Sequence, residues 1–206
     1  MREKKSIIEL TRCSVAQYKA MRKLPLSVLT DNVRSMHNIG AIFRTADAFR
    51  VSEVILGGIS GCPPHPEISK SALGAEESVA WRHVDSALDE VQRLQADGWR
   101  ICVLEQTHNS IPLHEFSIKH IIKGVNGESV NGNGELRKIN VEPAEDIKLV
   151  LVAGNEVNGV DQRIVDAADY ILEIPQEGTK HSLNVSTSAA IALFHLYTML
   201  NVECRM

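Results

Sequence analysis

The residues with the clearest chemical potential lie in one stretch near the C-terminus. Residues 174–186 read Ile-Pro-Gln-Glu-Gly-Thr-Lys-His-Ser-Leu-Asn-Val-Ser and precede a long apolar run. Ser182, Asn184 and Ser186 therefore stand where a helix is expected to begin, beside backbone N–H groups that lack a partner within the helix. Such a helix start attracts anions, including carboxylates and phosphates. Because one capping residue is enough for a helix, three alternating polar residues indicate either an elaborate cap or a binding loop.

A second polar stretch covers residues 31–44, which read Asp-Asn-Val-Arg-Ser-Met-His-Asn-Ile-Gly-Ala-Ile-Phe-Arg. Asn38 is predicted to cap a helix over Asn38–Arg50. The apolar face of this helix carries Ile39, Ile42, Phe43, Ala46 and Phe49. At ~100° per residue, Arg44 projects away from that face. It is either a solvated surface arginine or a side chain that is free to reach a ligand.

A third stretch, residues 149–159, reads Leu-Val-Leu-Val-Ala-Gly-Asn-Glu-Val-Asn-Gly. It predicts a buried strand that runs into a turn, with Gly154 and Gly159 on either side of Glu156. Glycine lets a backbone approach a ligand or another segment closely. The stretch is neither a Walker loop, since Lys-Ser/Thr is missing, nor a G-x-G-x-x-G fingerprint. A binding turn and a plain strand-to-loop turn with an exposed glutamate both remain open.

The elements that must position these residues alternate between strands and helices, which predicts an α/β fold. The expected strands cover residues 26–29, 53–56, 79–84, 101–104, 149–153 and 170–174. The expected helices cover residues 18–23, preceded by a Ser14 and Gln17 capping box, 38–50, 85–97, with Asp85 as cap and Gly98 after the end, 161–168 and 184–200. The Gly- and Asn-rich segment 124–134 interrupts this pattern. It predicts an exposed insertion at about 118–146 that forms a flexible loop or a hairpin tip.

Composition restricts the function classes. The 206 residues are 44% hydrophobic and 23% charged with a formal net charge of −4, so a nucleic-acid surface would have to be a local basic patch. Aromatic residues make up 4%, which disfavours a stacking platform for single-stranded bases.

Neither a metal site nor a disulfide framework is expected. The four cysteines form no C-x-x-C pair, and His108, His114 and His120 lie in loop-like sequence. An N-terminus without an apolar signal core, and apolar runs well below ~18 residues, favour a cytoplasmic protein without a membrane segment.

Together, three motifs resemble the TrmH family of the SPOUT superfamily, which contains 2′-O-ribose RNA methyltransferases. They are Asn38 with Arg44, the Gly-x-Glu-x-x-Gly turn at residues 154–159, and Ile-Pro…Gly…Ser-Leu-Asn-Val-Ser at residues 174–186. The resemblance extends over residues 26–200. Gln176 stands where many members have Met, and Thr187-Ser188 replace a small apolar pair. The Gly/Asn-rich insertion is not a general family feature.

The resemblance implies a parallel sheet with helices on both faces and a C-terminal trefoil knot within residues 149–200. The methyltransferase domain is expected over residues 26–206, and the capping box at Ser14 and Gln17 makes residues 1–25 an N-terminal helical extension. The resemblance also implies a homodimer in which the last helix contributes to the interface.

The activity implied by the resemblance is methyl transfer from S-adenosyl-L-methionine to a ribose 2′-hydroxyl in RNA, without a metal. Matching positions give the catalytic residues as Asn38, Arg44, Glu156, Ser182 and Asn184. The cofactor-binding residues are Leu104, Glu105, Thr107, Gly154, Ile174, Gly178 and Leu183, and the RNA-binding residues are Arg34, Lys180 and His181. Because a guanidinium is a very poor base, Arg44 either relays a proton with the RNA phosphate or stabilises the developing alkoxide, and we prefer the second role.

Three functions stay open at this stage. The absence of a separate N-terminal substrate domain, together with the Glu105-Gln-Thr and Ile-Pro-Gln signatures, favours a tRNA methyltransferase. An rRNA methyltransferase would use the same chemistry. An RNA-binding module without activity is disfavoured, because all the matching catalytic positions are intact.

Overall fold

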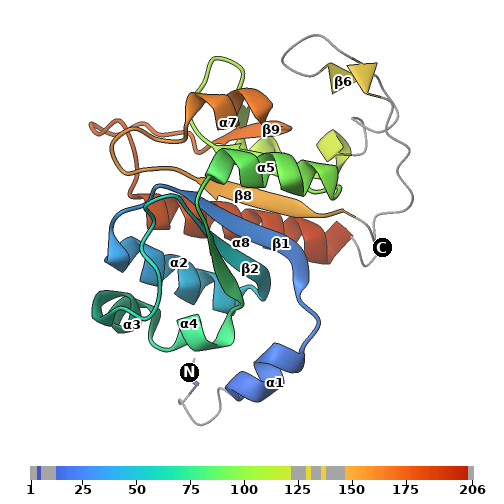
Figure 1. Ribbon diagram of the computed structural model, residues 1–206. Helices are drawn as coiled ribbons and strands as arrows, with labels where there is room; N and C mark the ends of the chain where they lie inside the picture. The colour runs from blue at the N-terminus through green and yellow to red at the C-terminus, as the bar shows by residue number, and fades with distance from the viewer. Residues whose placement is uncertain (1–3, 6–12, 122–128, 131–135, 138–146, 204–206) are drawn as a thin grey trace.

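A parallel sheet forms the centre of the molecule (Figure 1). The computed structural model describes residues 4–5, 13–121, 129–130, 136–137 and 147–203. The sheet has seven strands in the order β3-β2-β1-β8-β4-β9-β5, and every pairing in it is parallel. The strands are β1 Leu24–Asp31, β2 Val51–Gly57, β3 Trp81–Val84, β4 Arg100–Leu104, β5 Ile111–Pro112, β8 Leu149–Ala153 and β9 Tyr170–Glu173.

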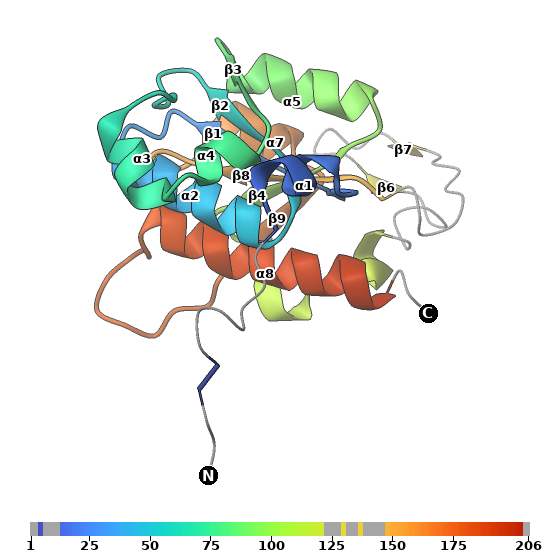
Figure 2. The ribbon, with the colours of Figure 1, turned by 90° about the horizontal axis from the view of Figure 1, so that it is seen from below.

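Helices cover both faces of the sheet. Figure 2 shows α2 and α8 below the strands and α5 and α7 above them. The helices are α1 Val15–Ala20, α2 Met36–Ala48, α3 Pro66–Ala72, α4 Ala75–Ser78, α5 Ala87–Ala96, η1 Leu113–Glu115, α7 Gln162–Ala167 and α8 Val185–Glu203. The α/β class with two covered faces is therefore confirmed.

The central strand β8 shows why this arrangement suits the sequence. All five of its residues are buried. Leu149 and Leu151 pack in the core that contains α2 and α8, whereas Val150 and Val152 pack in the core that contains α5 and α7. Successive side chains of a strand point to opposite faces, so only a sheet covered on both sides can bury a continuous apolar run.

The structure corrects two of the predicted helix starts. Helix α2 begins at Met36 with Ser35 as its N-cap, because the Ser35 hydroxyl accepts the Asn38 N–H at 3.3 Å. Asn38 therefore lies within the first turn, and its amide is available for other contacts. Likewise Ser86, and not Asp85, caps α5 by accepting the N–H of Asp89. Helices α3 and α4 have no counterpart among the predicted helices.

The N-terminal helix is present but starts three residues before the predicted range of 18–23, because a helix begins directly after its N-cap residue. The capping box of Ser14 and Gln17 is present in full and begins α1 at Val15. Tyr18 on this helix is 5% exposed and belongs to the main core. Most of the expected insertion lies outside the described residues. Within it, β6 Ser129–Val130 pairs antiparallel with β7 Leu136–Arg137.

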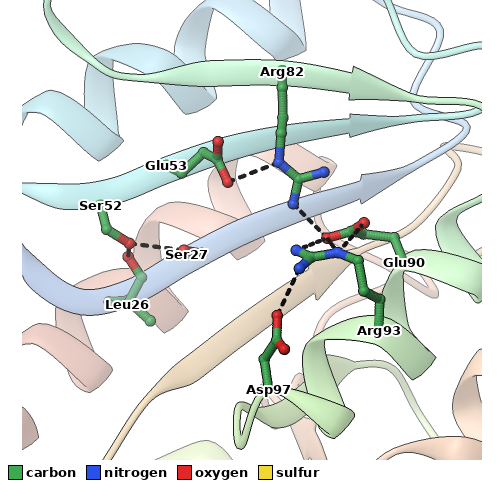
Figure 3. A network of polar contacts seen from close by, with 8 residues as sticks. All are labelled: Leu26, Ser27, Ser52, Glu53, Arg82, Glu90, Arg93 and Asp97. Carbon is green, nitrogen blue, oxygen red and sulfur yellow. Dashed lines mark hydrogen bonds and ion pairs between the residues drawn. The ribbon is translucent and has the colours of Figure 1, made fainter.

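A polar network fastens the edge strand β3 to α5 (Figure 3). Arg82 of β3 donates to Glu53 of β2 at 3.1 Å and to Glu90 of α5. Arg93 also donates to Glu90, and it forms an ion pair with Asp97 at 2.6 Å. Burial would raise the pKa of Glu90, whose side chain is 6% exposed, but the hydrogen bonds from Arg93 and Arg82 outweigh it and lower the pKa to about 2.

Candidate active site

A cavity of about 480 Å³ opens at the carboxyl ends of β4, β8 and β9. Parallel strands bring their carboxyl ends to one edge of a sheet, where ligands of α/β proteins commonly bind. The volume falls within the usual range for small-molecule sites. Its walls come from the segments that follow these three strands and from the start of α8, namely residues 104–106, 153–159, 172–174, 176, 182–185 and 188.

Glu156 fastens the turn after β8 to the start of α2. One carboxylate oxygen accepts the backbone N–H of Ser35 at 3.0 Å and the side-chain amide of Asn38 at 3.1 Å. The other accepts the backbone N–H of Arg34 at 3.2 Å. Burial would raise the pKa of Glu156, but hydrogen bonds from its own backbone N–H and from these three donors lower it overall. The carboxylate is thus held in its ionised form.

Asn38 joins the turn after β8 to the start of α8. It is 6% exposed, and its amide nitrogen is the donor to Glu156. Its amide oxygen accepts from the Asn184 side chain at 3.0 Å and lies 3.4 Å from the Ser186 hydroxyl. The Asn184 oxygen in turn accepts the N–H groups of Ser186 and Thr187. Asn184 therefore acts as a helix cap and also joins α8 to α2 through Asn38, and its role in a binding loop stays a prediction.

Glu105 braces the turn after β8 against the end of β4. Its carboxylate accepts the backbone N–H of Gln106 and of Val160, each at 3.1 Å. Gly159 makes room for it, because a Cβ at that position would lie 2.3 Å from a Glu105 oxygen. Gly159 also has a φ of +69°, which L-residues rarely adopt. A Cβ at Gly154 would lie 2.3 Å from backbone atoms of Gly159 and Val160, so both glycines are required by the tight turn.

The structure distributes the predicted cofactor-binding residues unevenly. Five of the seven line the cavity: Leu104, Glu105, Gly154, Ile174 and Leu183. Thr107 and Gly178 lie outside the lining, and a Cβ on Gly178 would meet nothing within 4 Å. A role in cofactor binding remains a prediction for all seven.

The predicted catalytic and RNA-binding residues divide in the same way. Asn38, Glu156 and Asn184 are joined by hydrogen bonds, and Ser182 lines the cavity. Arg44 is exposed on α2, does not line the cavity, and makes no hydrogen bond or ion pair with any described residue. The Asn184 amide donates to Asn38 and not to Arg44. The predicted RNA-binding residues are all exposed: Arg34, Lys180 and His181.

Two residues of the site escaped a functional interpretation from sequence. Ser35 caps α2, and Asn155 closes the turn by accepting the N–H groups of Val157 and Asn158. Ser186, which the sequence places at the start of the last helix, contacts the Asn38–Asn184 pair. A serine three residues before Asn38, and an asparagine after the first glycine of the turn, were the available signals.

The charges of the lining select among ligand classes. Of the lining residues within the described part of the chain, three carry carboxylates, Glu105, Glu156 and Glu173, and none is a lysine or an arginine. Anionic phosphate groups would find no cation among these residues, whereas a ligand with a positive centre and apolar surface would be favoured. These residues therefore fit S-adenosyl-L-methionine, which carries a sulfonium and an adenosine group. Among the described residues, no three His, Cys, Asp or Glu side chains are grouped to hold a metal ion.

A family model confirms the class that the sheet and cavity define. The chain belongs to the SpoU rRNA Methylase family, whose model matches residues 25–194. None of the described helices is both long and apolar enough to cross a membrane.

Curated relatives share this part of their sequence with the chain. The chain is 27% identical over 188 residues to rRNA methyltransferase 1, mitochondrial, of Saccharomyces cerevisiae, covering 86% of the chain and 42% of that protein. It is 29% identical over 171 residues to a 23S rRNA (guanosine-2′-O-)-methyltransferase of Vibrio vulnificus, covering 82% and 58%. A Staphylococcus saprophyticus protein named for the TrmH family of tRNA/rRNA methyltransferases is 25% identical over 187 residues, covering 91% and 64%. The chain thus spans less than two thirds of the length of these relatives.

Solved structures support the fold. The TrmH/SpoU tRNA modifying enzyme of A. aeolicus superposes with a TM-score of 0.70 at 24% identity, covering 92% of this chain and 82% of that one. A structure described as giving insight into 2-OH methylation of C/U34 on tRNA superposes with a TM-score of 0.63 at 20% identity, covering 86% and 99%. The predicted SPOUT-type sheet is thereby confirmed, and the trefoil knot stays a prediction.

Proposed function

We propose that this chain transfers a methyl group from S-adenosyl-L-methionine to a ribose 2′-hydroxyl in RNA. The observation that carries the proposal is the cavity at the carboxyl ends of β4, β8 and β9, whose described lining residues include three carboxylates and no lysine or arginine. Membership of the SpoU family supports the same activity. When bound, the cofactor supplies an activated methyl group. The protein must hold the ribose oxygen in line with it and manage one proton.

Some residues of the site hold other residues in place, and others are free to contact the RNA. Glu156 and Asn38 are each engaged by several hydrogen bonds within the protein, which favours a positioning role for both. Ser182 has no hydrogen-bond partner among the described residues, so its hydroxyl is free to meet the nucleotide. Because a guanidinium is a very poor base, Arg44 acts as a fixed cation that stabilises the alkoxide as the hydroxyl loses its proton to water.

A homodimer would complete this site. Arg44 is exposed and does not line the cavity of its own chain. On α8, Phe194 is 57% and Ile191 41% exposed, and Phe194 lies 5.8 Å from the Phe49 ring at the end of α2. Pairing of two copies through α2 and α8 would bury this apolar surface and bring each Arg44 towards an intersubunit site.

For the substrate, we favour tRNA over rRNA, with Arg34, Lys180 and His181 as RNA contacts in a cytoplasmic enzyme. The curated relatives are named for both RNA classes, so the relatives do not decide between them. Deleting the gene and mapping lost ribose methylations across tRNA and rRNA would decide it. A single missing site in tRNA is the expected result.

The test of the activity uses Arg44. Arg44→Ala should abolish methyl transfer to RNA from deletion cells, while calorimetry shows cofactor affinity unchanged within a few-fold. Arg44→Lys keeps the charge but loses the planar fork, so it should restore only part of the rate. Near-normal turnover of Arg44→Ala would refute the role of Arg44. A wild-type protein that binds the cofactor but methylates no cellular RNA would refute the proposed function.

A further inference from the structure

Two aliphatic side chains are strongly exposed at the cavity end of the molecule. Val157, in the turn after β8, is 74% exposed, and Ile59, in the loop after β2, is 66% exposed. Single apolar residues on a surface are ordinary, so exposure alone assigns no role. The way in which their two loops are held together provides the second observation.

Asn32 connects the two loops. Its side-chain oxygen accepts the backbone N–H of Ile59 at 3.1 Å, and its backbone carbonyl accepts the Asn155 side chain at 2.7 Å. Asn32 has a φ of 56°, in the left-handed region, which asparagine adopts more readily than most residues other than glycine. The two contacts of Asn32 hold this turn in place between the loops.

The turn after β8 also fixes the outward position of Val157. The Asn155 oxygen accepts the N–H of Val157 at 2.9 Å and that of Asn158 at 3.2 Å. Asn155 and Gly159 exchange backbone hydrogen bonds at 2.9 and 3.0 Å, which closes the turn. The exposure of Val157 is therefore a property of an ordered turn.

A cationic side chain belongs to the same junction. Val33, directly before Arg34, donates its N–H to Ser60 at 3.0 Å, so the Arg34 segment is held against the loop of Ile59. Arg34 also donates its backbone N–H to Glu156, the neighbour of Val157. Arg34 is thus an exposed cation whose segment is hydrogen-bonded to both the loop of Ile59 and the turn of Val157.

We propose that Ile59 and Val157 form a platform for a nucleobase of the RNA substrate, with Arg34 beside a phosphate. An apolar surface next to a guanidinium matches the two parts of a nucleotide, a flat base and an anionic backbone. The inference rests on the proposed function, which places a ribose at the adjoining cavity. It adds a contact that does not depend on the cofactor.

The test compares RNA with and without bases. Fluorescence anisotropy measures binding of a short, mixed-sequence, single-stranded RNA and of an abasic ribose-phosphate chain of equal length. The Ile59→Ser/Val157→Ser double variant should bind the base-bearing probe about tenfold more weakly, which is ~1.4 kcal/mol, and the abasic probe within about twofold of wild type. Leu73→Ser, at a site that is 67% exposed after α3, is the matched control and should change neither affinity.

Equal losses on both probes, or no loss on either, would overturn the platform. A change in the molar mass of the double variant by light scattering would overturn it as well, since the two residues would then serve a protein interface. Because the assay needs no methyl transfer, it is independent of the proposed activity. If the wild type methylates RNA and the double variant keeps its KM for RNA, the platform alone fails.

Discussion

Replacement of Glu156 by glutamine tests how the site is assembled. The glutamine oxygen can still accept from Ser35 and Asn38, but its amino group then faces the Arg34 N–H, and two donors oppose each other. In the reversed orientation the glutamine would lose two hydrogen bonds, those from Ser35 and Asn38, so the first orientation is preferred. The variant therefore loses one charge-assisted hydrogen bond and weakens the other two.

The size of the effect follows from these contacts. A hydrogen bond to a charged group contributes ~1.5–3 kcal/mol, and the lower end applies because Glu156 is exposed. A loss of ~1–2 kcal/mol shifts the equilibrium between the attached and detached turn about 5- to 30-fold. Glu156→Ala removes all three bonds and should cost ~3 kcal/mol or more.

The assay is NMR-detected hydrogen exchange at the backbone N–H groups of Arg34 and Ser35. Both should exchange about 5- to 30-fold faster in Glu156→Gln, and kcat/KM for methyl transfer should fall by a similar factor. Glu67→Gln is the control, because this exposed carboxylate on α3 has no hydrogen-bond or ion-pair partner among the described residues. Unchanged exchange at Arg34 and Ser35 in Glu156→Ala would refute the reasoning.

Three further predictions concern stability. Gly159→Ala should lower the free energy of unfolding by ~1–2 kcal/mol and weaken cofactor binding, because a left-handed alanine is strained and its Cβ collides with Glu105. Urea denaturation measures the stability and calorimetry the cofactor affinity. Wild-type values in both would contradict the predicted collision. Glu90→Gln should lower the free energy of unfolding by ~2–3 kcal/mol at pH 7. Since the pKa of Glu90 falls from 4.5 to about 2 on folding, the stability that its charge contributes is complete above pH 4.5 and is lost as the pH falls towards 2. A difference between wild type and variant in urea denaturation that does not shrink at pH 3 would argue against this role. Gly40→Ala should destabilise the contact of α2 with α3, because the Cβ would lie 2.0 Å from the Ser71 hydroxyl and 2.4 Å from the Ile68 carbonyl; thermal melts should show a lower Tm, which Ser71→Ala restores only in part, and an unchanged Tm would refute the close packing.

Sequence patterns predicted the sheet well because its apolar runs are continuous. Leu149–Ala153 is buried along its whole length, and such a run is typical of a parallel strand covered on both faces. Helix starts were less predictable, since Ser35 and Asn38 are both good caps and only tertiary contacts decide between them. Asn38 is drawn to Glu156 and Asn184, which are distant in sequence, so the cap falls to Ser35.

The sequence indicated residues of the candidate site but not the hydrogen bonds that join them. The glycines at 154 and 159 indicated close backbone approach, and the structure shows that one of them makes room for Glu105. No local sequence pattern shows that the Glu105 carboxylate accepts the N–H of Val160. Such contacts join strands that become neighbours only through the sheet order, which residue spacing does not reveal.

The position of β8 has a consequence for how the chain is made. In the sheet, β4 lies between β8 and β9, and β8 separates β4 from β1. During synthesis on the ribosome, β1 and β2 can pair early, but β4 has no partner until residues 149–153 have emerged from the exit tunnel. Until then, the nascent chain presents unpaired strand edges that favour aggregation, and their long-range closure is intrinsically slow. Protection of the nascent chain by chaperones should therefore matter most before the C-terminal part is released.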